Sequence, residues 1–280
     1  MRHKNVLKCI IENVRKGYIP QRSMGISSES PPKQTSSQQC GLFCWARGGK
    51  LHTAMHGGIR TARSCHLDAF DERRAAGWWG MPILRKCHTE PDRLMGFNEI
   101  LSRKRADHSA GVHFYLDDYQ FERLWARPER YLHILSRFAC VLTPDFSLYM
   151  DMPRAMKIWN VYRSRLLGQM MQDAGMAVIP TLSWAEPETF SFCFDGIEPG
   201  GTVSVSTVGV KRSREASDVW RAGFREAVRR LHPSCVILYG EALDGIDYGG
   251  RIIRIRNEVT ARMKARANHG RPRSIERNQR

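Results

Sequence analysis

Residues 139–184 read ACVLTPDFSLYMDMPRAMKIWNVYRSRLLGQMMQDAGMAVIPTLSW and predict a strand, a helix and a second strand. The runs 139–143 and 176–179 are apolar on both faces, which is typical of strands buried in a parallel sheet. Between them, apolar residues recur at three- and four-residue spacing from Met152 to Met170, as on one helix face. Because a crossover of this kind is right-handed almost without exception, the stretch also predicts the local topology.

The ends of the predicted helix carry ordinary helix signals. Asp151 can cap its N-terminus, Pro153 suits the first turn, and Gly175 suits the C-terminal stop. The basic side chains between these ends are expected to form a solvated face; they are Arg154, Lys157, Arg163 and Arg165.

The same alternation of strands and helices continues on both sides of this unit. Further strands are predicted at 111–116, 202–207 and 235–239, and helices at 119–138, interrupted by Pro128, and at 219–231. Residues 95–98 are predicted to form a turn or a short cap, and 190–194 a short apolar piece. We therefore expect an α/β domain over 66–250 with a mainly parallel sheet. Without a dinucleotide-binding glycine fingerprint, a complete or incomplete TIM-like barrel is favoured over an open sheet.

The net charge of +16 is concentrated at the two ends of the chain. Residues 1–65 contain 11 Lys and Arg and 2 acidic residues, and residues 251–280 contain 10 Lys and Arg and 2 acidic residues. The central residues 66–250 contain 23 Lys and Arg and 24 acidic residues. The first segment is predicted to be a low-complexity, disordered extension, and 251–280 a basic tail. A basic tail can bind nucleic acid non-specifically, whereas the nearly neutral centre offers no such surface.

Other features narrow the class of protein. No apolar run approaches the roughly 20 residues that span a bilayer, so we expect a cytoplasmic protein without a membrane partner. Cys87, Cys140, Cys193 and Cys235 are predicted to be reduced packing residues. A zinc site is conceivable at Cys40, Cys44, His52 or His56 and Cys65, but this spacing fits no common zinc finger. No metal site is therefore predicted, and the sequence indicates no particular cofactor.

Polar and small residues follow the predicted strands. In parallel α/β folds the loops after the strands form the binding face. This rule selects two candidate catalytic carboxylates, Asp145 and Asp117. It also selects candidate substrate-binding residues, which are Asp118, Ser147, Trp184, Gly209 and Glu241. Such carboxylates can serve as a general base, a nucleophile or oxygen ligands for a hard metal ion.

Asp145 is the strongest of these candidates, because it follows a buried strand and precedes an irregular loop rather than a helix that it could cap. It could instead accept loop N–H groups and hold the turn. Asp118 could cap a helix that begins at Tyr119. Trp184 could stack on a flat ligand or belong to the core.

Four long runs carry a resemblance to a known family. They are GVHFYLDDYQFER (111–123), VLTPDFSLYMDMP (141–153), IWNVYRSR (158–165) and VSVSTVG (203–209). Over about residues 68–250 the chain resembles a family of phage, mobile-element and bacterial proteins known only as a domain of unknown function. This resemblance implies a folded cytoplasmic protein and no assigned activity.

At the level of fold, the chain is also similar to the barrels of tRNA-guanine transglycosylases and their DNA-modifying relatives. The similarity lies in an Asp after a Pro at one strand end, an aromatic residue after an Ile-Pro strand, and a Gly after a Val-Ser-Val strand. It implies an aspartate nucleophile in base exchange. The Cys/His zinc cluster that those tRNA enzymes carry near the C-terminus is missing from this sequence.

Two classes of function remain open on these grounds. The first is an enzyme that acts on a nucleobase, nucleotide or nucleic acid with carboxylates at the strand ends. The alternative is a non-enzymatic accessory protein of a mobile element that binds nucleic acid through its Arg-rich tail.

Overall fold

The computed structural model describes residues 60–102, 106–244, 246 and 248–257. Nearly all of the extension predicted over 1–65 and the greater part of the predicted basic tail lie outside these residues. The same holds for Cys40, Cys44, His52 and His56 of the zinc hypothesis.

In the described part of the chain, the strands form two parallel sheets and one small antiparallel pair. The strands are β1 (Ala75–Ala76), β2 (Met81–Pro82), β3 (Leu94–Gly96), β4 (Gly111–His113), β5 (Cys140–Leu142), β6 (Val178–Ile179), β7 (Thr202–Ser206), β8 (Cys235–Tyr239) and β9 (Arg251–Ile255). One sheet has the order β3-β4-β5-β6, the other has the order β7-β8-β9, and β1 pairs with β2. Every neighbouring pair within the two larger sheets is parallel. The predicted mixed α/β fold with mainly parallel sheets is therefore confirmed.

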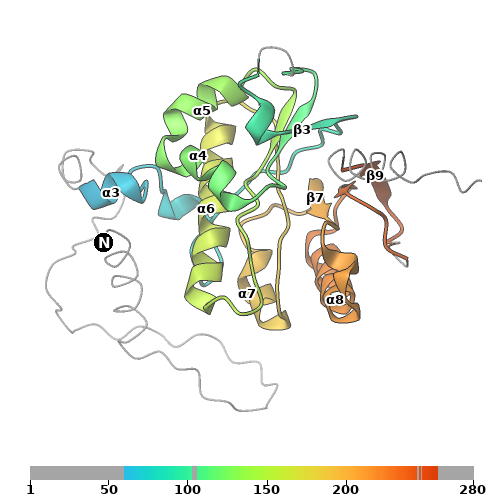
Figure 1. Cartoon of the computed structure of the whole chain (residues 1–280). Coiled ribbons are helices and arrows are strands. Elements are labelled where there is room, and N and C mark those ends of the chain that lie inside the picture. The colour runs from blue at the N-terminus through green and yellow to red at the C-terminus, as the bar shows by residue number, and fades with distance from the viewer. Residues whose placement is uncertain (1–59, 103–105, 245, 247, 258–280) are drawn as a thin grey trace, which may run out of the picture. The chain divides into compact units, whose positions relative to one another are not determined.

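Helices connect most of these strands and pack outside the sheets (Figure 1). The α-helices are α3 (Arg60–Ser64), α4 (Glu122–Ala126), α5 (Pro128–Leu135), α6 (Arg154–Asp173), α7 (Phe190–Cys193) and α8 (Arg214–Leu231). The 3-10 turns are η1 (Glu72–Arg74), η2 (Phe97–Glu99), η3 (Asp118–Gln120), η4 (Pro187–Thr189) and η5 (Val210–Arg212). The predicted interruption at Pro128 is confirmed, since this proline starts α5.

The central unit has the predicted topology, with β5 and β6 paired in parallel and α6 between them. Strands 111–116 and 139–143, expected to be neighbours, pair as β4 and β5. Gly175 has a φ of +83° just after α6, as a helix stop requires. The predicted cap at Asp151 is wrong, because α6 begins at Arg154 after Pro153 and no side chain caps it.

Three short segments differ from the prediction. Residues 94–96 form strand β3 where a turn was expected, and Phe190–Cys193 form helix α7. The basic tail was predicted to begin at Arg251, but Arg251–Ile255 pairs with all five residues of β8. In this strand Ile255 is buried while Arg251 and Arg254 are exposed, so a strand with exposed basic residues was mistaken for the start of a charged tail.

The two larger sheets meet at one parallel bridge, Thr181 with Ser204. A cluster of residues from both sheets packs together; its buried members are Cys140, Leu142, Ile179, Ile237, Tyr239 and Ile255. Among the described residues, no strand ladder joins β9 to β3. The predicted TIM-like barrel is thus not shown.

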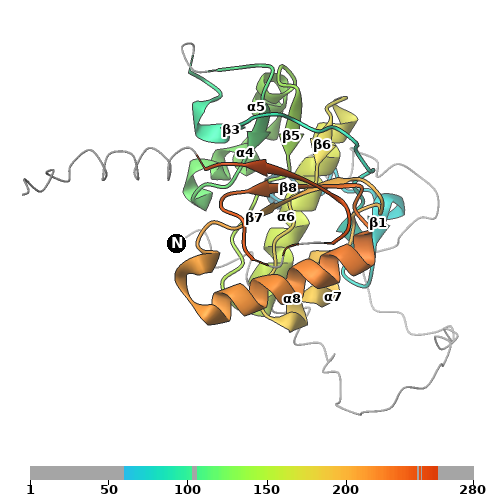
Figure 2. The same ribbon diagram turned by 90° about the vertical axis from the view of Figure 1, so that its right-hand side faces the viewer.

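Two further hydrophobic clusters attach the helices to the sheets. One packs α4, α5 and α6 against β4 and β5, and includes Phe114, Leu124, Leu135, Val141 and Leu166. The other packs α8 against β7 and β8 through Trp220, Phe224, Val203 and Leu238. Figure 2 shows α8 running along the outside of the three-stranded sheet. Cys140, Cys193 and Cys235 are buried and free, and Cys87 is half-buried and free, which confirms the prediction of reduced packing residues.

The basic residues of α6 contradict the predicted solvated face. Lys157, Arg163 and Arg165 are only 1%, 8% and 2% exposed, and only Arg154 points to solvent. Arg165 donates to three backbone carbonyls, those of Cys193 (2.7 Å), Asp195 (3.2 Å) and Thr181 (3.4 Å). Burial lowers the pKa of Arg165 to about 10, so the guanidinium remains charged at neutral pH. These cations therefore belong to the interior.

Replacing Arg165 should destabilise the fold strongly. Arg165→Ala leaves buried carbonyl oxygens without donors and opens a cavity, and we expect a loss of about 3–5 kcal/mol in unfolding free energy. Arg154→Ala is the matched control on the same helix and should change stability by less than about 0.5 kcal/mol. Urea denaturation measures both, and equal effects would contradict the assignment of Arg165 to the interior.

Candidate active site

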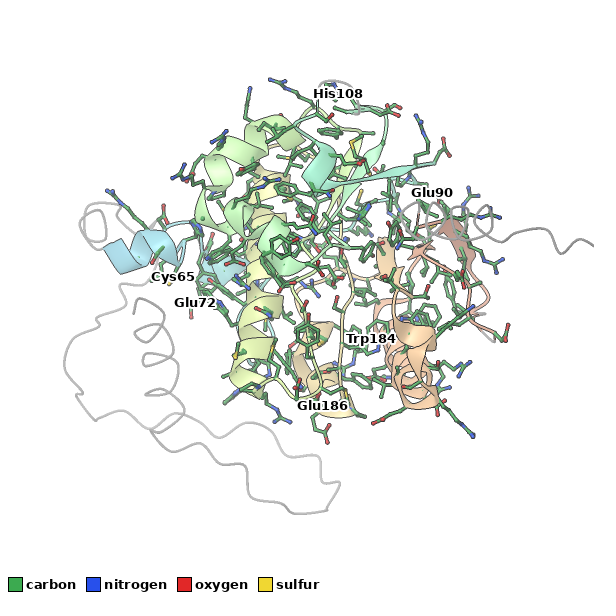
Figure 3. The ribbon with its side chains drawn as sticks, in the orientation of Figure 1. Cys65, Glu72, Glu90, His108, Trp184 and Glu186 are labelled. Atoms are coloured by element: carbon green, nitrogen blue, oxygen red, sulfur yellow. The ribbon has the colours of Figure 1, made fainter. Side chains whose placement is uncertain are left out.

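The carboxyl ends of the parallel strands surround a cavity of about 1070 Å³. Figure 3 shows the direction of the strands: His108 and Glu90, which precede β4 and β3, lie toward the upper side, whereas Trp184 and Glu186, which follow β6, lie toward the lower side. The predicted site residues that line the cavity are Asp117, Asp145, Ser147, Trp184 and Gly209. The expectation that strand-end residues gather in one place therefore holds for these five.

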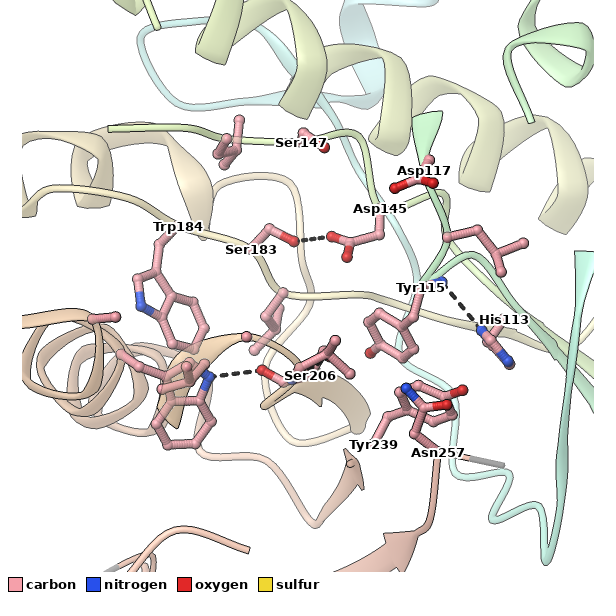
Figure 4. A pocket seen from close by; sticks show the side chains of 18 of the residues that line it. His113, Tyr115, Asp117, Asp145, Ser147, Ser183, Trp184, Ser206, Tyr239 and Asn257 are labelled. Carbon is pink, nitrogen blue, oxygen red and sulfur yellow. Dashed lines mark hydrogen bonds between the residues drawn. The ribbon is translucent and has the colours of Figure 1, made fainter. Parts of the chain in front are cut away.

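Asp145 lies in the cavity lining between the ends of two adjacent strands. It follows β5 by three residues and is partly exposed, and the Ser183 hydroxyl, beyond the end of β6, donates a hydrogen bond to its carboxylate (Figure 4). Burial raises the pKa of Asp145 from 3.8 to about 7; the Ser183 hydrogen bond opposes this shift and the charge of Asp118 adds to it. Asp145 can therefore exist in both protonation states near neutral pH.

Asp118 and Ser147 hold two strand-end loops together. The Ser147 N–H and hydroxyl both donate to the Asp118 carboxylate, at 3.1 Å and 2.8 Å. Asp118 starts the short turn η3, but its side chain does not cap the helix predicted from Tyr119. This carboxylate lies outside the cavity lining, so it acts on Asp145 through its charge and through the loop that it fixes.

Asp117 and Glu241 occupy different places. Asp117 lines the cavity with an exposed side chain that makes no cap hydrogen bond. Glu241 is not among the lining residues; its carboxylate is exposed and lies 3.4 Å from Lys211 Nζ. Gly209 lines the cavity with a φ of +81°, a conformation that glycine adopts without strain.

Trp184 is fixed against helix α8. Its indole Nε1 donates to the Val219 carbonyl (3.3 Å), and its ring lies near the rings of Trp220 and Phe194. A Cβ atom at Gly223 would lie only 2.2 Å from Nε1 of Trp184, so the absence of a side chain at Gly223 makes room for the indole. Trp184 is half-buried and lines the cavity, so it combines packing with exposure to a ligand.

Several lining residues were missed by the sequence prediction. Tyr115 stacks on Tyr239 with ring centroids 4.8 Å apart, and His113 lies 4.5 Å from the Tyr239 ring. Burial lowers the pKa of His113 to about 4, so its ring is neutral at pH 7. The strand-end rule could have found Tyr115 and Tyr239, because both stand at the end of a predicted strand. Asn257 follows β9, which was not predicted, so no sequence signal indicated it.

The inner face of α6 supports the loop that carries the site. Lys157 donates to the Met150 carbonyl (3.1 Å) and pairs with Glu186, and Asn160 donates to the Ser147 carbonyl (2.8 Å). The guanidinium carbon of Arg163 lies 3.8 Å from the centroid of the Phe146 ring. The loop between β5 and α6 is therefore held by side chains from the helix that follows it.

The described part of the chain contains no group of three or more His, Cys, Asp and Glu side chains placed to hold a metal ion. No helix in this part combines the length and the apolar character needed to cross a membrane.

A mainly parallel α/β fold with a cavity at the strand ends, lined by both apolar and polar side chains, defines the class of this protein. The chain belongs to the family described as domain of unknown function DUF4417, whose model matches residues 73–256. The predicted resemblance to a family without an assigned activity is thereby confirmed.

Two curated proteins, both called Gene 1 protein, are similar to the chain. The protein of Mycobacterium phage D29 is 45% identical over 161 residues, which cover 57% of this chain and 60% of the phage protein. The protein of Mycobacterium phage L5 is 44% identical over 162 residues, covering 58% of this chain and 71% of the phage protein. No solved structure matches the chain, so the resemblance to transglycosylase barrels gains no support.

Asp145 should make stability depend on pH. Its pKa is raised in the folded state, so between about pH 4 and pH 7 the folded chain binds the proton that the unfolded chain has released, and stability falls as pH rises. Asp145→Asn removes this group. We expect the variant to melt at a higher temperature than the wild type at pH 8, and the difference to shrink toward pH 4. A variant that melts lower at pH 8 would assign Asp145 a structural role.

Gly223→Ala should displace Trp184. Overpacking costs about 1–3 kcal/mol, which outweighs the gain of about 1 kcal/mol from replacing a helical glycine. In a Trp184→Ala background the same substitution should be neutral or stabilising, because the indole is gone. Denaturation of the four proteins of this cycle measures the coupling, and additive effects would contradict the packing of Gly223 against Trp184.

Proposed function

We propose that the protein is an enzyme that acts on a nucleobase, nucleotide or nucleic acid, with Asp145 as the reacting acid, base or nucleophile. The observation that carries the proposal is a carboxyl group in the lining of a large cavity, with a pKa that burial raises to about 7. A pKa near the working pH suits a group that both takes up and releases a proton.

The surrounding residues have separate roles in this proposal. Ser183 orients the Asp145 carboxylate, and Asp117 is a second carboxylate that can contact a bound molecule. Trp184 offers an aromatic surface, which suits a flat ligand. Asp118 and Ser147 fix the loops, and their mutual hydrogen bonds support a positioning role. Glu241 is assigned no contact with the substrate.

We also propose that the seven parallel strands β3 to β9 form an incomplete barrel. The chain order of the strands is their spatial order within each sheet, and the Thr181–Ser204 bridge links the two sheets. Side chains from both sheets pack between them, as in a barrel interior. This arrangement would place all the strand ends around one cavity, where ligands of such folds bind.

The alternative is a non-enzymatic protein that binds nucleic acid through its basic C-terminal segment. Residues 258–280 contain seven Lys and Arg against two Glu. A chain that ends at Asn257 separates the two proposals while keeping β9 intact. An accessory binder would lose its salt-dependent DNA affinity, whereas an enzyme would keep the binding and chemistry of the cavity.

The direct test replaces Asp145 and follows ligand binding. A panel of nucleobases, nucleosides and nucleotides is titrated by calorimetry into the wild type, Asp145→Asn and the control Asp151→Asn, whose exposed residue lies outside the cavity lining. We expect Asp145→Asn to weaken binding at least about tenfold, since hydrogen bonds to charged groups contribute about 1.5–3 kcal/mol. Equal affinities in the three proteins would reject the cavity as the site.

A further inference from the structure

We propose that the cavity selects an uncharged or positively charged planar heterocycle that donates hydrogen bonds, and that phosphate groups stay outside it. This inference rests on the proposed function, because it names the substrate class of the same site: a nucleobase or nucleoside moiety rather than a nucleotide phosphate.

The charge of the lining is the first observation. Four lining residues contribute carboxyl groups, while Arg256 is the one Lys or Arg among the lining residues that the structure describes; the four are Glu99, Asp117, Asp145 and Glu215. His113 adds no positive charge at neutral pH, because burial lowers its pKa. A phosphate inside the cavity would therefore meet like charges, which repel it.

The N-terminus of α8 also lines the cavity, and a helix N-terminus favours anions. Two side chains of the protein already supply negative or hydrogen-bond-accepting groups at this helix end. The Ser213 hydroxyl oxygen accepts from the Ala216 N–H at 3.0 Å, and Glu215 places a carboxylate in the first turn. A phosphate would have to compete with both groups.

The hydrogen-bonding capacity of the inner lining is the third observation. The Ser204 hydroxyl donates to the Ile237 carbonyl at 3.3 Å, so the Tyr115 hydroxyl, 2.6 Å from Ser204, is the donor in that pair. The Thr181 side chain is a further hydrogen-bonding neighbour of the Tyr115 oxygen, so the free acceptor capacity here belongs to the Asp145 carboxylate, which accepts from Ser183 and can accept more. Acceptors in this part of the cavity match a ligand that presents N–H groups.

Aromatic rings define the shape of the accepted ligand. Figure 4 shows the Trp184 indole on one side of the view and the stacked Tyr115 and Tyr239 on the other, with Asp145 and Ser183 above and between them. Flat rings bind well against aromatic faces and edges. A planar heterocycle would fit between these rings with its polar edge toward Asp145.

The test compares each nucleoside with its own 5′-monophosphate, by calorimetry with the full chain at pH 8 and low salt. Inorganic phosphate is the competing probe. We expect at least one nucleoside or free base to bind at least about tenfold more tightly than its monophosphate, a difference of about 1.4 kcal/mol. Asp117→Asn and Glu215→Gln should narrow this gap, whereas Glu188→Gln, an exposed residue outside the lining, should leave it unchanged.

The outcomes separate this inference from the proposed function. Equal or tighter binding of the monophosphate, competition by inorganic phosphate, or no binding by any nucleoside or base would overturn the inference. If the monophosphate binds and this binding is lost in Asp145→Asn, the inference is overturned but the proposed function still stands. Preferred nucleoside binding that is unchanged in Asp145→Asn would support the inference and reject Asp145 as the reacting group.

Discussion

The buried polar face of α6 is the interaction on which the arrangement of this domain depends. Loops after parallel strands expose carbonyl groups that need donors once they are covered. Arg165 supplies donors to the carbonyls of Cys193 and Asp195 at the end of α7, and Lys157 supplies one to the Met150 carbonyl. The loops that follow β5 and β6 are therefore held by one helix, and their positions fix the geometry of the cavity. Removing a buried charged donor of this kind lowers the unfolding free energy by more than an exposed ion pair contributes to it.

Asp145 stands in contrast to this well-paired interior. Lys157 and Arg163 each face a carboxylate, whereas no ion pair to Asp145 is found among the described residues. Its one strong partner is the Ser183 hydroxyl, and the charge of Asp118 acts against its ionised form. At neutral pH this arrangement costs stability. Groups that are kept in such unfavourable surroundings are concentrated at functional sites, and this is the physical basis for the proposed reaction at Asp145.

Much of the fold could be predicted, because apolar runs and helix periodicity are local signals. Strand β8 has its predicted ends, and the place of Asp145 followed from the strand-end rule alone. The errors arose where tertiary contacts decide. Arg165 is polar in sequence yet buried, since its carbonyl partners lie on segments 16 to 30 residues away. Strand β9 reads Arg-Ile-Ile-Arg-Ile, and only its pairing with β8 distinguishes it from a basic tail. Local patterns carry neither kind of information.

Titration of the Asp145 carboxyl group by carbon-detected NMR tests the central claim most directly. Selectively labelled aspartate in the wild type, assigned by comparison with Asp145→Asn, should give one carboxyl resonance with a midpoint near pH 7, the value that burial produces. Ser183→Ala should raise this midpoint, because the hydroxyl donates to the ionised form. A midpoint near the ordinary aspartate value of about 3.9 would show a well-solvated carboxylate and would contradict the account.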